Sequence, residues 1–386
     1  MIRNVFIKKI VKSTIFPFFS WLNKIVPKNQ DTILLYTANQ GICFSLIPLR
    51  KYLLENGFDK KYKIYCGIEH LKYADGEKRV KYVAGLQAIL TYLKAGHVFY
   101  TAGQIPIKPA KDQLVFHLRH GNANFKSSGC HTNINNGDEF YFTHMVAPSN
   151  LFVPVMASEY RCSTDNILVA GDPLTDQLLQ NKRKNYDFSE YNKVLMWMPT
   201  FRQSDYYGYD DTDMKEIVPL FPPKDYELLN EKLSKYNIKL IVKVHYAQST
   251  GEGENEHYSH LSIYSNESFI KQGYDTYKMM AQCDGLIGDY SSASLQYLLL
   301  DRPQAYVVPD IKDYSKHRSF VFENPEDYMG GHIIKSKEDF WIFLDDFACG
   351  KDVYADKRHW VCHQIYKYHD ANSCQRIVQH NGITLD

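Results

Sequence analysis

A carboxylate and two hydroxyls lie close together in the segment GDYSSASLQYLLLDRPQ, residues 288–304. The apolar residues 285–288 predict a buried strand, and the apolar positions that follow recur at helical spacing. Asp289 should therefore lie at a strand-to-helix turn, with Ser291 and Ser292 at the helix N-cap and first turn. Backbone N–H groups and the helix dipole attract anions there, so this segment predicts a phosphate site. An ordinary N-cap is the alternative interpretation.

Two other apolar segments of the second half also end at polar side chains. One ends at Thr200 and Arg202, and the other at Lys243 and His245. The carboxyl ends of parallel strands share one edge of a sheet, and ligands of open α/β sheets bind at that edge. Arginine can bind phosphate oxygens bidentately, and histidine can donate hydrogen bonds or move protons. Together with Asp289, these residues predict a pyrophosphate site.

The first half of the chain contains a comparable segment, FHLRHGNANFKSSG, at residues 116–129. His120 follows an apolar strand pattern, and the turn at Gly121 should present it at the carboxyl end of that strand. Lys126 lies in a loop rich in Gly, Asn and Ser that could approach an anion closely. His117 precedes the turn, so we interpret it as a side chain within the strand.

The elements that would position these residues alternate between strand and helix patterns. In the first half we expect strands at 32–37, 61–69, 97–102, 112–121, 139–149 and 166–173, with helices at 42–57 and 78–96. In the second half we expect strands at 192–201, 238–246, 261–265, 285–288 and 303–310, with helices at 224–237, 275–283 and 292–301. Such alternation predicts mostly parallel sheets covered on both faces.

We therefore expect an α/β protein with two Rossmann-like domains that face each other across a cleft. The expected boundaries are 31–185 for the first domain and 186–345 for the second, followed by C-terminal helices at 346–386. No G-x-G-x-x-G fingerprint follows a strand, which disfavours a dinucleotide enzyme.

The first 28 residues contain six basic side chains, no acidic ones, and many Phe and Ile residues. No stretch reaches the ~18 uninterrupted apolar residues of a spanning helix, and no signal-peptide cleavage pattern follows. Basic and aromatic side chains together predict an interfacial helix within residues 1–30 that contacts an anionic membrane surface. This would make the protein peripheral, at the cytoplasmic face of the cell membrane. A helix packed against its own domain is the alternative.

Composition narrows the classes of partner. The net charge of +1 gives no overall field that would favour nucleic acid. The eight cysteines are scattered without any C-x-x-C pair, which argues against a zinc ribbon or a disulfide framework and favours a reducing compartment. We expect neither a cofactor nor a metal site.

Several short segments resemble the motifs of the CDP-glycerol glycerophosphotransferases, the family of teichoic acid primases and polymerases. The segments are RHGNANFKSSG (119–129), GDPLTDQLL (171–179), VLMWMPTFR (194–202), KVHY (243–246), GDYSSASLQYLLLDRPQ (288–304) and DIKDYSKHRSFVFE (310–323). The resemblance implies a GT-B fold and transfer of a polyol phosphate from a CDP-activated donor. It also implies functional roles for His120, Arg202, His245, Asp289, Ser291, Ser292 and Arg318.

The chain departs from these motifs at several positions, and the altered loop after Arg119 lies on the presumed acceptor side. Arg119 stands where the family usually has Trp, and Asn122–Asn124 replaces Thr-Pro-Leu. Tyr246 replaces Pro, and Ser319 replaces Gly. A capsule or another cell-surface glycan is therefore as plausible an acceptor as a wall teichoic acid.

The implied reaction is attack of an acceptor hydroxyl on the β-phosphorus of CDP-glycerol or another CDP-polyol, with release of CMP. The acceptor would be a glycan or polyol phosphate, typically lipid-linked in such enzymes. His120 would be the base, and Asp289 would orient a histidine or a donor hydroxyl. The donor phosphates would be held by Arg202, His245, Arg318 and the helix start at Ser291 and Ser292, so that no metal is required.

Two other functions remain open. A GT-B glycosyltransferase that uses a nucleotide sugar would need the same fold. A non-catalytic scaffold in polysaccharide assembly would bind nucleotide weakly or not at all. The presence of His120, His245 and Asp289 together argues for an enzyme.

Overall fold

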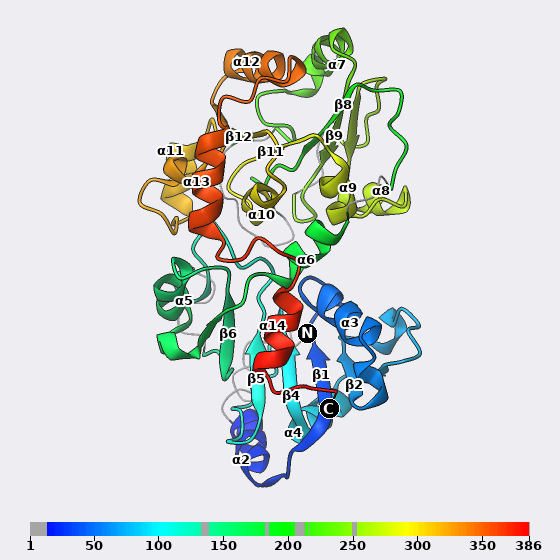
Figure 1. Cartoon of the computed structure of the whole chain (residues 1–386), viewed down its shortest axis with the longest axis vertical. Helices are drawn as coiled ribbons and strands as arrows, with labels where there is room; N and C mark the ends of the chain where they lie inside the picture. Colours follow the sequence, from blue (N-terminus) through cyan, green and yellow to red (C-terminus); the bar gives the residue numbers. More distant parts are fainter. Residues whose placement is uncertain are drawn as a thin grey trace. The chain divides into compact units, whose positions relative to one another are not determined.

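The computed structural model describes residues 14–132, 139–181, 185–204, 212, 214, 216–248 and 253–385. The chain divides into two compact units, each built around its own sheet (Figure 1). Unit 1 comprises residues 1–122, 137–176 and 370–386, and unit 2 comprises residues 123–136 and 177–369. Each unit is therefore assembled from segments that are separated in the sequence.

Unit 1 contains a seven-stranded sheet in the order β3-β2-β1-β4-β5-β6-β7, with every neighbouring pair parallel. Its strands are β1 (Asn29–Tyr36), β2 (Lys63–Gly67), β3 (Lys81–Val83), β4 (Ala95–Tyr100), β5 (Leu114–His117), β6 (His144–Ala147) and β7 (Ile167–Val169). Its helices are α2 (Phe16–Ile25), α3 (Leu46–Glu55), α4 (Leu86–Lys94), α5 (Phe152–Tyr160) and α14 (Ser373–His380), and α6 (Pro173–Gln180) contains the residue at which unit 2 resumes.

Alternating side chains of β1 pack against different helices of unit 1. Ile33 and Leu35 belong to the core beneath α3 and α14, whereas Leu34 belongs to the core beneath α4 and α2. This period of two is the ordinary geometry of a strand that is buried on both faces. The unbroken apolar run of β1 is thereby explained.

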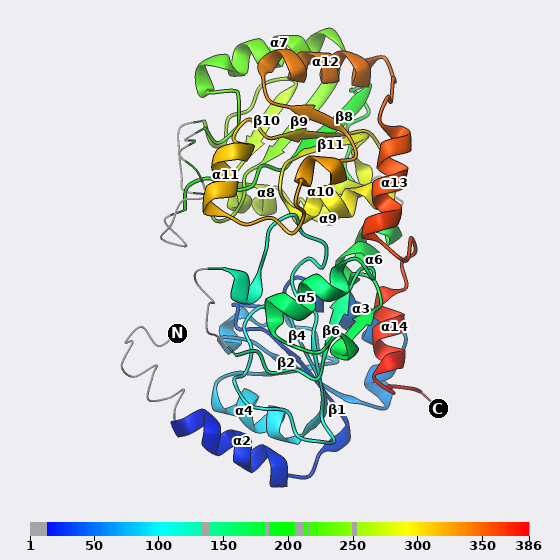
Figure 2. The ribbon, with the colours of Figure 1, turned by 90° about the vertical axis from the view of Figure 1, so that its left-hand side faces the viewer.

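Unit 2 contains a six-stranded parallel sheet in the order β10-β9-β8-β11-β12-β13. Its strands are β8 (Lys193–Trp197), β9 (Ile238–Lys243), β10 (Leu261–Tyr264), β11 (Gly285–Gly288), β12 (Gln304–Val307) and β13 (His332–Ile334). Its helices are α7 (Tyr226–Lys235), α8 (Asn266–Lys271), α9 (Thr276–Gln282), α10 (Ser292–Tyr297), α11 (Ile311–His317), α12 (Lys337–Ala348) and α13 (Ala355–Ile365). Helices α7 and α12 cover one face of this sheet, and α8, α9 and α10 cover the other (Figure 2).

Both sheets contain a point at which the strand order reverses. In unit 1 the chain runs outward from β1 to β3, then returns to place β4 beside β1. In unit 2 it runs from β8 to β10, then returns to place β11 beside β8. Ligands of open α/β sheets bind at such points, outside the carboxyl ends of the strands. The predicted α/β class with two Rossmann-like sheets is confirmed.

For one predicted element the type of secondary structure is wrong. The range 78–96 was expected to be a single helix, but it contains strand β3 and then helix α4, separated by Gly85 in a left-handed conformation (φ 53°). A three-residue strand is too short for its apolar pattern to show a period of its own. Pairing with β2, which is a tertiary contact, determines its structure.

The helix α2 packs against unit 1 (Figure 2). Phe16, Phe19 and Leu22 contact the core that α4 helps to form. The buried Asn23 side chain donates hydrogen bonds to the Lys108 carbonyl (3.0 Å) and to Gln113 Oε1 (2.8 Å). Residues 16–25 therefore match the alternative interpretation, a helix packed against its own domain, while the first 13 residues lie outside the described part of the chain.

The outer face of α2 nevertheless carries large apolar side chains. Ile15, Phe18, Trp21 and Ile25 are between 44% and 59% exposed, and we call them the outer stripe. Their spacing places them on one side of the helix. Among the described residues, no helix is both long enough and apolar enough to cross a membrane.

Candidate functional site

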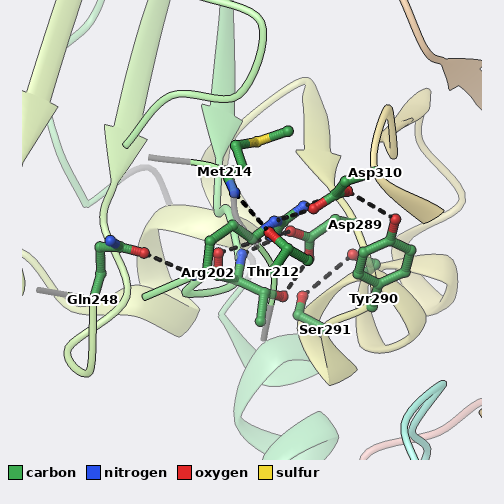
Figure 3. Close-up of polar contacts among 10 residues, drawn as sticks. Arg202, Thr212, Met214, Gln248, Asp289, Tyr290, Ser291 and Asp310 are labelled. Carbon is green, nitrogen blue, oxygen red and sulfur yellow. Dashed lines mark hydrogen bonds and ion pairs between the residues drawn. The ribbon is translucent and has the colours of Figure 1, made fainter. Parts of the chain in front are cut away.

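Arg202 and Asp289 form a buried ion pair at the reversal point of unit 2 (Figure 3). Arg202 lies shortly after β8 and Asp289 directly follows β11, and each is only 1% exposed. Arg202 Nη1 lies 2.6 Å from Asp289 Oδ2, and Arg202 Nε lies 2.8 Å from Oδ2 of Asp310, which follows β12. One guanidinium therefore links the residues beyond three strand ends.

Hydrogen bonds from neighbouring groups complete this network. The backbone N–H of Thr200 donates to Asp289 Oδ2 (2.7 Å), and the Thr200 hydroxyl donates to Asp289 Oδ1. Tyr290 donates its hydroxyl proton to Asp310 Oδ1 (3.0 Å). Burial alone would lower the pKa of Arg202, but the carboxylates of Asp289 and Asp310 outweigh it and hold that pKa above its ordinary value.

In this geometry Arg202 and Asp289 contact other groups than those expected. Arg202 was expected to bind phosphate oxygens, but it is buried, and its Nε and Nη1 groups donate to carboxylates and to the Thr200 carbonyl. Asp289 was expected to orient a histidine or a donor hydroxyl, but in the described part of the chain it accepts hydrogen bonds from Thr200 and Arg202. The network instead fixes the strand ends around it.

Sequence reasoning did not identify Asp310 as a partner in this network. The available signal was its place at the start of DIKDYSKHRSFVFE, where a carboxylate follows the predicted strand 303–310. Gln248 was also missed, although its Oε1 accepts a hydrogen bond from the backbone N–H of Arg202 (2.8 Å). Gln248 lies in a loop without apolar periodicity, so its sequence context carried no comparable signal.

The predicted helix start after β11 is confirmed. Ser291 is the N-cap of α10 in an extended conformation (φ −81°, ψ 153°), and Ser292 is the first helical residue. The Ser291 hydroxyl does not cap the helix and lies 3.3 Å from Ser294 Oγ instead. Gly288 permits close packing here, because an added Cβ would lie 2.1 Å from Ser294 Oγ. Ser291 and Ser292 are half-buried, and their binding of phosphate stays a prediction.

His245 lies just beyond β9 and is half-buried. Its Nδ1 accepts a hydrogen bond from the backbone N–H of Ala247 (3.1 Å), so Nε2 carries the proton in the neutral ring. The ring centroid lies 5.3 Å from that of Phe201 and 4.6 Å from that of Tyr246. The ring is thus oriented, with Nε2 as a hydrogen-bond donor.

Lys126 also lies close to Phe201, although it comes from the segment predicted to belong to the first half. Its Nζ is 6.0 Å from the centroid of the Phe201 ring, and it pairs with Phe320 in an isolated antiparallel bridge. The segment around Lys126 belongs to unit 2. The structure therefore gathers Lys126 and His245 around one aromatic ring, a grouping that the sequence did not predict.

Arg318 is the C-cap of helix α11, two residues before Phe320, which forms the isolated bridge with Lys126. Its backbone N–H donates to the Tyr314 carbonyl (2.9 Å), and its side chain is half-buried. The next residue, Ser319, accepts a hydrogen bond from the backbone N–H of Ser127 (2.9 Å). Pairing of the two segments therefore brings the Lys126 and Arg318 regions of the chain together.

Lys243 is the last residue of β9, and its side chain lies beside one polar and one aromatic side chain. Its Nζ donates to Asn266 Oδ1 (2.9 Å) and lies 5.6 Å from the centroid of the Phe269 ring. Burial lowers the pKa of Lys243 to about 8. This lysine can therefore change its charge near neutral pH.

In unit 1, His120 lies in an exposed turn after β5. Arg119 before it and Gly121 after it both have positive φ values (58° and 114°). The His120 ring centroid lies 5.4 Å from that of Phe44. His117 is the last residue of β5, as predicted, and burial lowers its pKa to about 3.

The described residues include no group of three or more His, Cys, Asp or Glu side chains placed to hold a metal ion. Hydroxyl, imidazole and lysine groups near the strand ends of unit 2 instead offer hydrogen-bond donors and positive charge. Such donors suit a phosphorylated ligand.

Residues 18–380 match the model of one protein family, described as CDP-Glycerol:Poly(glycerophosphate) glycerophosphotransferase. A teichoic acid glycerol-phosphate transferase of Staphylococcus aureus is 23% identical over 98% of this chain and 99% of its own. A teichoic acid ribitol-phosphate primase of Bacillus spizizenii is 26% identical over 61% of this chain, and the match spans 58% of the primase. The chain thus spans little more than half of that relative.

Solved structures share the fold. The wall teichoic acid polymerase TagF superposes with a TM-score of 0.74 at 18% identity, covering 98% of this chain and 96% of that one. A co-structure of S. aureus MnaA with UDP superposes with a TM-score of 0.55 at 12% identity, covering 90% of this chain and 95% of that one. The GT-B-like arrangement of strands and helices is therefore shared with both.

Proposed function

Because the chain belongs to the CDP-glycerol:poly(glycerophosphate) glycerophosphotransferase family, we propose that it transfers glycerol phosphate, or a related polyol phosphate, from a CDP-activated donor. The acceptor is a hydroxyl of a cell-surface glycan or a teichoic-acid-like polymer, and CMP is released. The observation that carries this proposal is the family match over residues 18–380, joined to the donors gathered at the strand ends of unit 2.

We assign donor binding to unit 2. His245 offers its Nε2 proton and Lys126 a positive charge beside the same Phe201 ring. Ser291, Ser292 and Arg318 would add hydroxyl and guanidinium donors to the pyrophosphate. Arg202 and Asp289 act indirectly, by holding the ends of β8 and β11 in place.

We assign proton removal to His120 of unit 1. Attack of a hydroxyl on phosphorus needs a base within hydrogen-bond reach of the proton and stabilised charge on the leaving CMP. An exposed imidazole is suited to the first task because its unprotonated ring nitrogen can accept the hydroxyl proton. Gly121 permits the turn after His120, since its φ of 114° disfavours any other residue.

The decisive experiment is incubation of the protein with a panel of CDP-polyols and nucleotide sugars, each with soluble acceptor analogues. Acceptor-dependent CMP release from CDP-glycerol or CDP-ribitol supports the proposal. Release of a nucleoside diphosphate from a nucleotide sugar would replace it with glycosyl transfer, the second candidate. The likeness to a UDP-bound protein of the same fold favours that candidate over the scaffold. No product, together with no nucleotide binding, would favour the scaffold.

We further propose that the acceptor is lipid-linked and that the protein works at the cytoplasmic face of the membrane. Two features of unit 1 support this. The outer stripe of α2 exposes four large apolar side chains. A pocket of about 280 Å³ beside α2 is mostly apolar, and its walls include Phe16, Tyr36, Ile68, Ile89, Ile105 and Glu69.

A further inference from the structure

The carbonyl oxygen of Arg119 accepts hydrogen bonds from two buried hydroxyls. Ser45 Oγ lies 3.1 Å from it, and Thr101 Oγ1 makes a shorter contact. Ser45 is 0% exposed and Thr101 is 2% exposed. They precede α3 and follow β4 respectively, so elements on both sides of the reversal point of unit 1 hold one peptide group.

The Ser45 side chain does not make the hydrogen bond that is usual at its position in the helix. Ser45 is the N-cap residue of α3, where a serine side chain usually accepts a hydrogen bond from a backbone N–H of the first turn. Here the side chain makes no capping hydrogen bond. Its hydroxyl instead donates to Arg119, 74 residues away in the sequence.

The peptide that these hydroxyls hold is conformationally unusual. Arg119 has φ 58°, a region that a residue with a Cβ seldom adopts unless its surroundings hold it there. Its side chain is held as well, with Nη1 3.8 Å from Glu159 Oε2 and the guanidinium carbon 5.4 Å from the centroid of the Tyr160 ring. Backbone and side-chain contacts therefore both maintain the left-handed turn.

His120 is the next residue, and the orientation of the peptide group between Arg119 and His120 determines where its backbone begins. A peptide group is planar, so fixing the Arg119 carbonyl also fixes the N–H and Cα of His120. We propose that Ser45 and Thr101 are positioning residues that hold this peptide so that His120 faces the acceptor hydroxyl. This inference rests on the proposed function, in which His120 is the base.

The test compares Ser45→Ala, Thr101→Val and the double variant with the wild type. Thr101→Val keeps the branched shape and removes only the hydrogen-bond donor. We expect kcat to fall about 10-fold for each single variant and about 100-fold for the double variant, comparable to the effect of a misplacement of about 1 Å. KM for the CDP-polyol should not change, and Thr101→Ser should restore most of kcat. An unchanged kcat in a folded double variant would overturn the inference.

Thr37→Val provides a matched control. Thr37 is 0% exposed, and its hydroxyl donates to the Ala102 carbonyl (3.3 Å) rather than to Arg119. Its loss should leave kcat within about twofold of the wild type. If kcat of Thr37→Val fell as much as that of Thr101→Val, loss of any buried hydrogen bond would explain both results. That outcome would refute a specific positioning role for Thr101.

A second measurement does not depend on turnover. The imidazole NMR signal of His120, assigned by its loss in His120→Ala, should shift in the double variant and not in Thr37→Val. An unshifted signal in the double variant overturns the inference whatever the activity. If the signal shifts but wild-type protein releases no CMP from any CDP-polyol, the proposed function fails while Ser45 and Thr101 still position His120.

Discussion

The polar residues at the reversal points of the two sheets differ in their burial and in their partners. In unit 2, Arg202 and Asp289 are buried, and their charges are matched within the protein (Figure 3). In unit 1, buried hydroxyls hold a backbone turn and leave His120 exposed. The comparison teaches that a charged residue at a strand end can be part of the scaffold, while its chemistry is left to neighbours that remain accessible.

The two arrangements should fail differently. Removing one partner of a buried ion pair leaves an uncompensated charge, which destabilises the fold. Removing an exposed imidazole leaves the packing intact and affects only what that ring does. Substitutions at the two edges should therefore separate stability from turnover.

The largest effect is expected for His120→Ala. If His120 is the base, kcat should fall by about 10²–10⁴-fold, the usual contribution of general base catalysis. CDP-polyol affinity and the midpoint of thermal unfolding should stay near wild type, because His120 is exposed. Turnover assays with calorimetry would measure both, and His70→Ala is the control, since the side chain of His70 is also well exposed (62%). Near-normal turnover of the folded variant would refute the assignment.

Arg202→Ala should instead lower the free energy of unfolding by about 3–5 kcal/mol, because Asp289 and Asp310 would remain buried without a cation. Arg50→Ala is the matched control. Arg50 makes an equally short ion pair with Asp75 (2.6 Å), but the side chain of Asp75 is 49% exposed, so the loss should be about 0–1 kcal/mol. Chemical denaturation measures both. Unchanged stability with weaker CDP binding would restore the phosphate-binding role of Arg202.

Lys243 predicts a pH dependence of donor binding. Its pKa is lowered by burial to about 8, so its positive charge is present below that pH and is lost as the pH rises through it. CDP affinity measured by calorimetry from pH 6.5 to 9 should fall across pH 8, by up to about 10-fold if the charge contributes about 1.4 kcal/mol. Lys243→Met should bind more weakly at pH 6.5 and lose this step. The same step in Lys243→Met would exclude Lys243 as its source.

The lowered pKa of Lys243 also affects folding stability. Donor affinity should fall as the pH rises, whereas the contribution of Lys243 to stability should rise. The pKa of Lys243 is lower in the folded chain than the ordinary value of 10.5. Between about pH 8 and 10.5 the unfolded chain therefore binds the additional proton, and the contribution of Lys243 to stability rises with pH. The difference in unfolding free energy between wild type and Lys243→Met should follow that direction.

The smallest effect is expected at the outer stripe. Trp21→Ser should weaken sedimentation with anionic vesicles by about 3–10-fold, because an aromatic side chain of an interfacial helix contributes on the order of 1 kcal/mol. Trp360→Ser is the control, since Trp360 of unit 2 is similarly exposed (50% against 57%). Equal vesicle binding by both variants would exclude the outer stripe as a membrane contact.

A point substitution is preferable to truncation near Asp31 for that test. Lys28 donates hydrogen bonds to the Val26 carbonyl (2.8 Å) and the Leu93 carbonyl (2.7 Å), and truncation would remove them. Removing residues 1–30 would also expose the core that Phe16, Phe19 and Leu22 cover. We therefore expect the truncated chain to lose stability in unit 1.

The sequence by itself determined the local elements of the site. Apolar runs identified β8, β9, β11 and β12 to within a few residues, and the Ser291 N-cap followed from its position between strand and helix. These features depend on side-chain periodicity and on hydrogen bonds between near neighbours, both of which are visible in a linear pattern.

The tertiary structure alone decided which polar groups are buried and what they contact. Arg202 meets Asp289 and Asp310 across 87 and 108 residues of sequence, and Ser45 reaches Arg119 across 74. Lys126 lies in the segment 123–136, which joins unit 2 although the flanking segments 1–122 and 137–176 belong to unit 1. The physical reason is that burial and charge pairing arise when strand ends meet at one sheet edge. The sequence pattern shows which residues follow a strand and therefore lie at that edge of the sheet. It does not show whether a side chain there faces solvent or a partner.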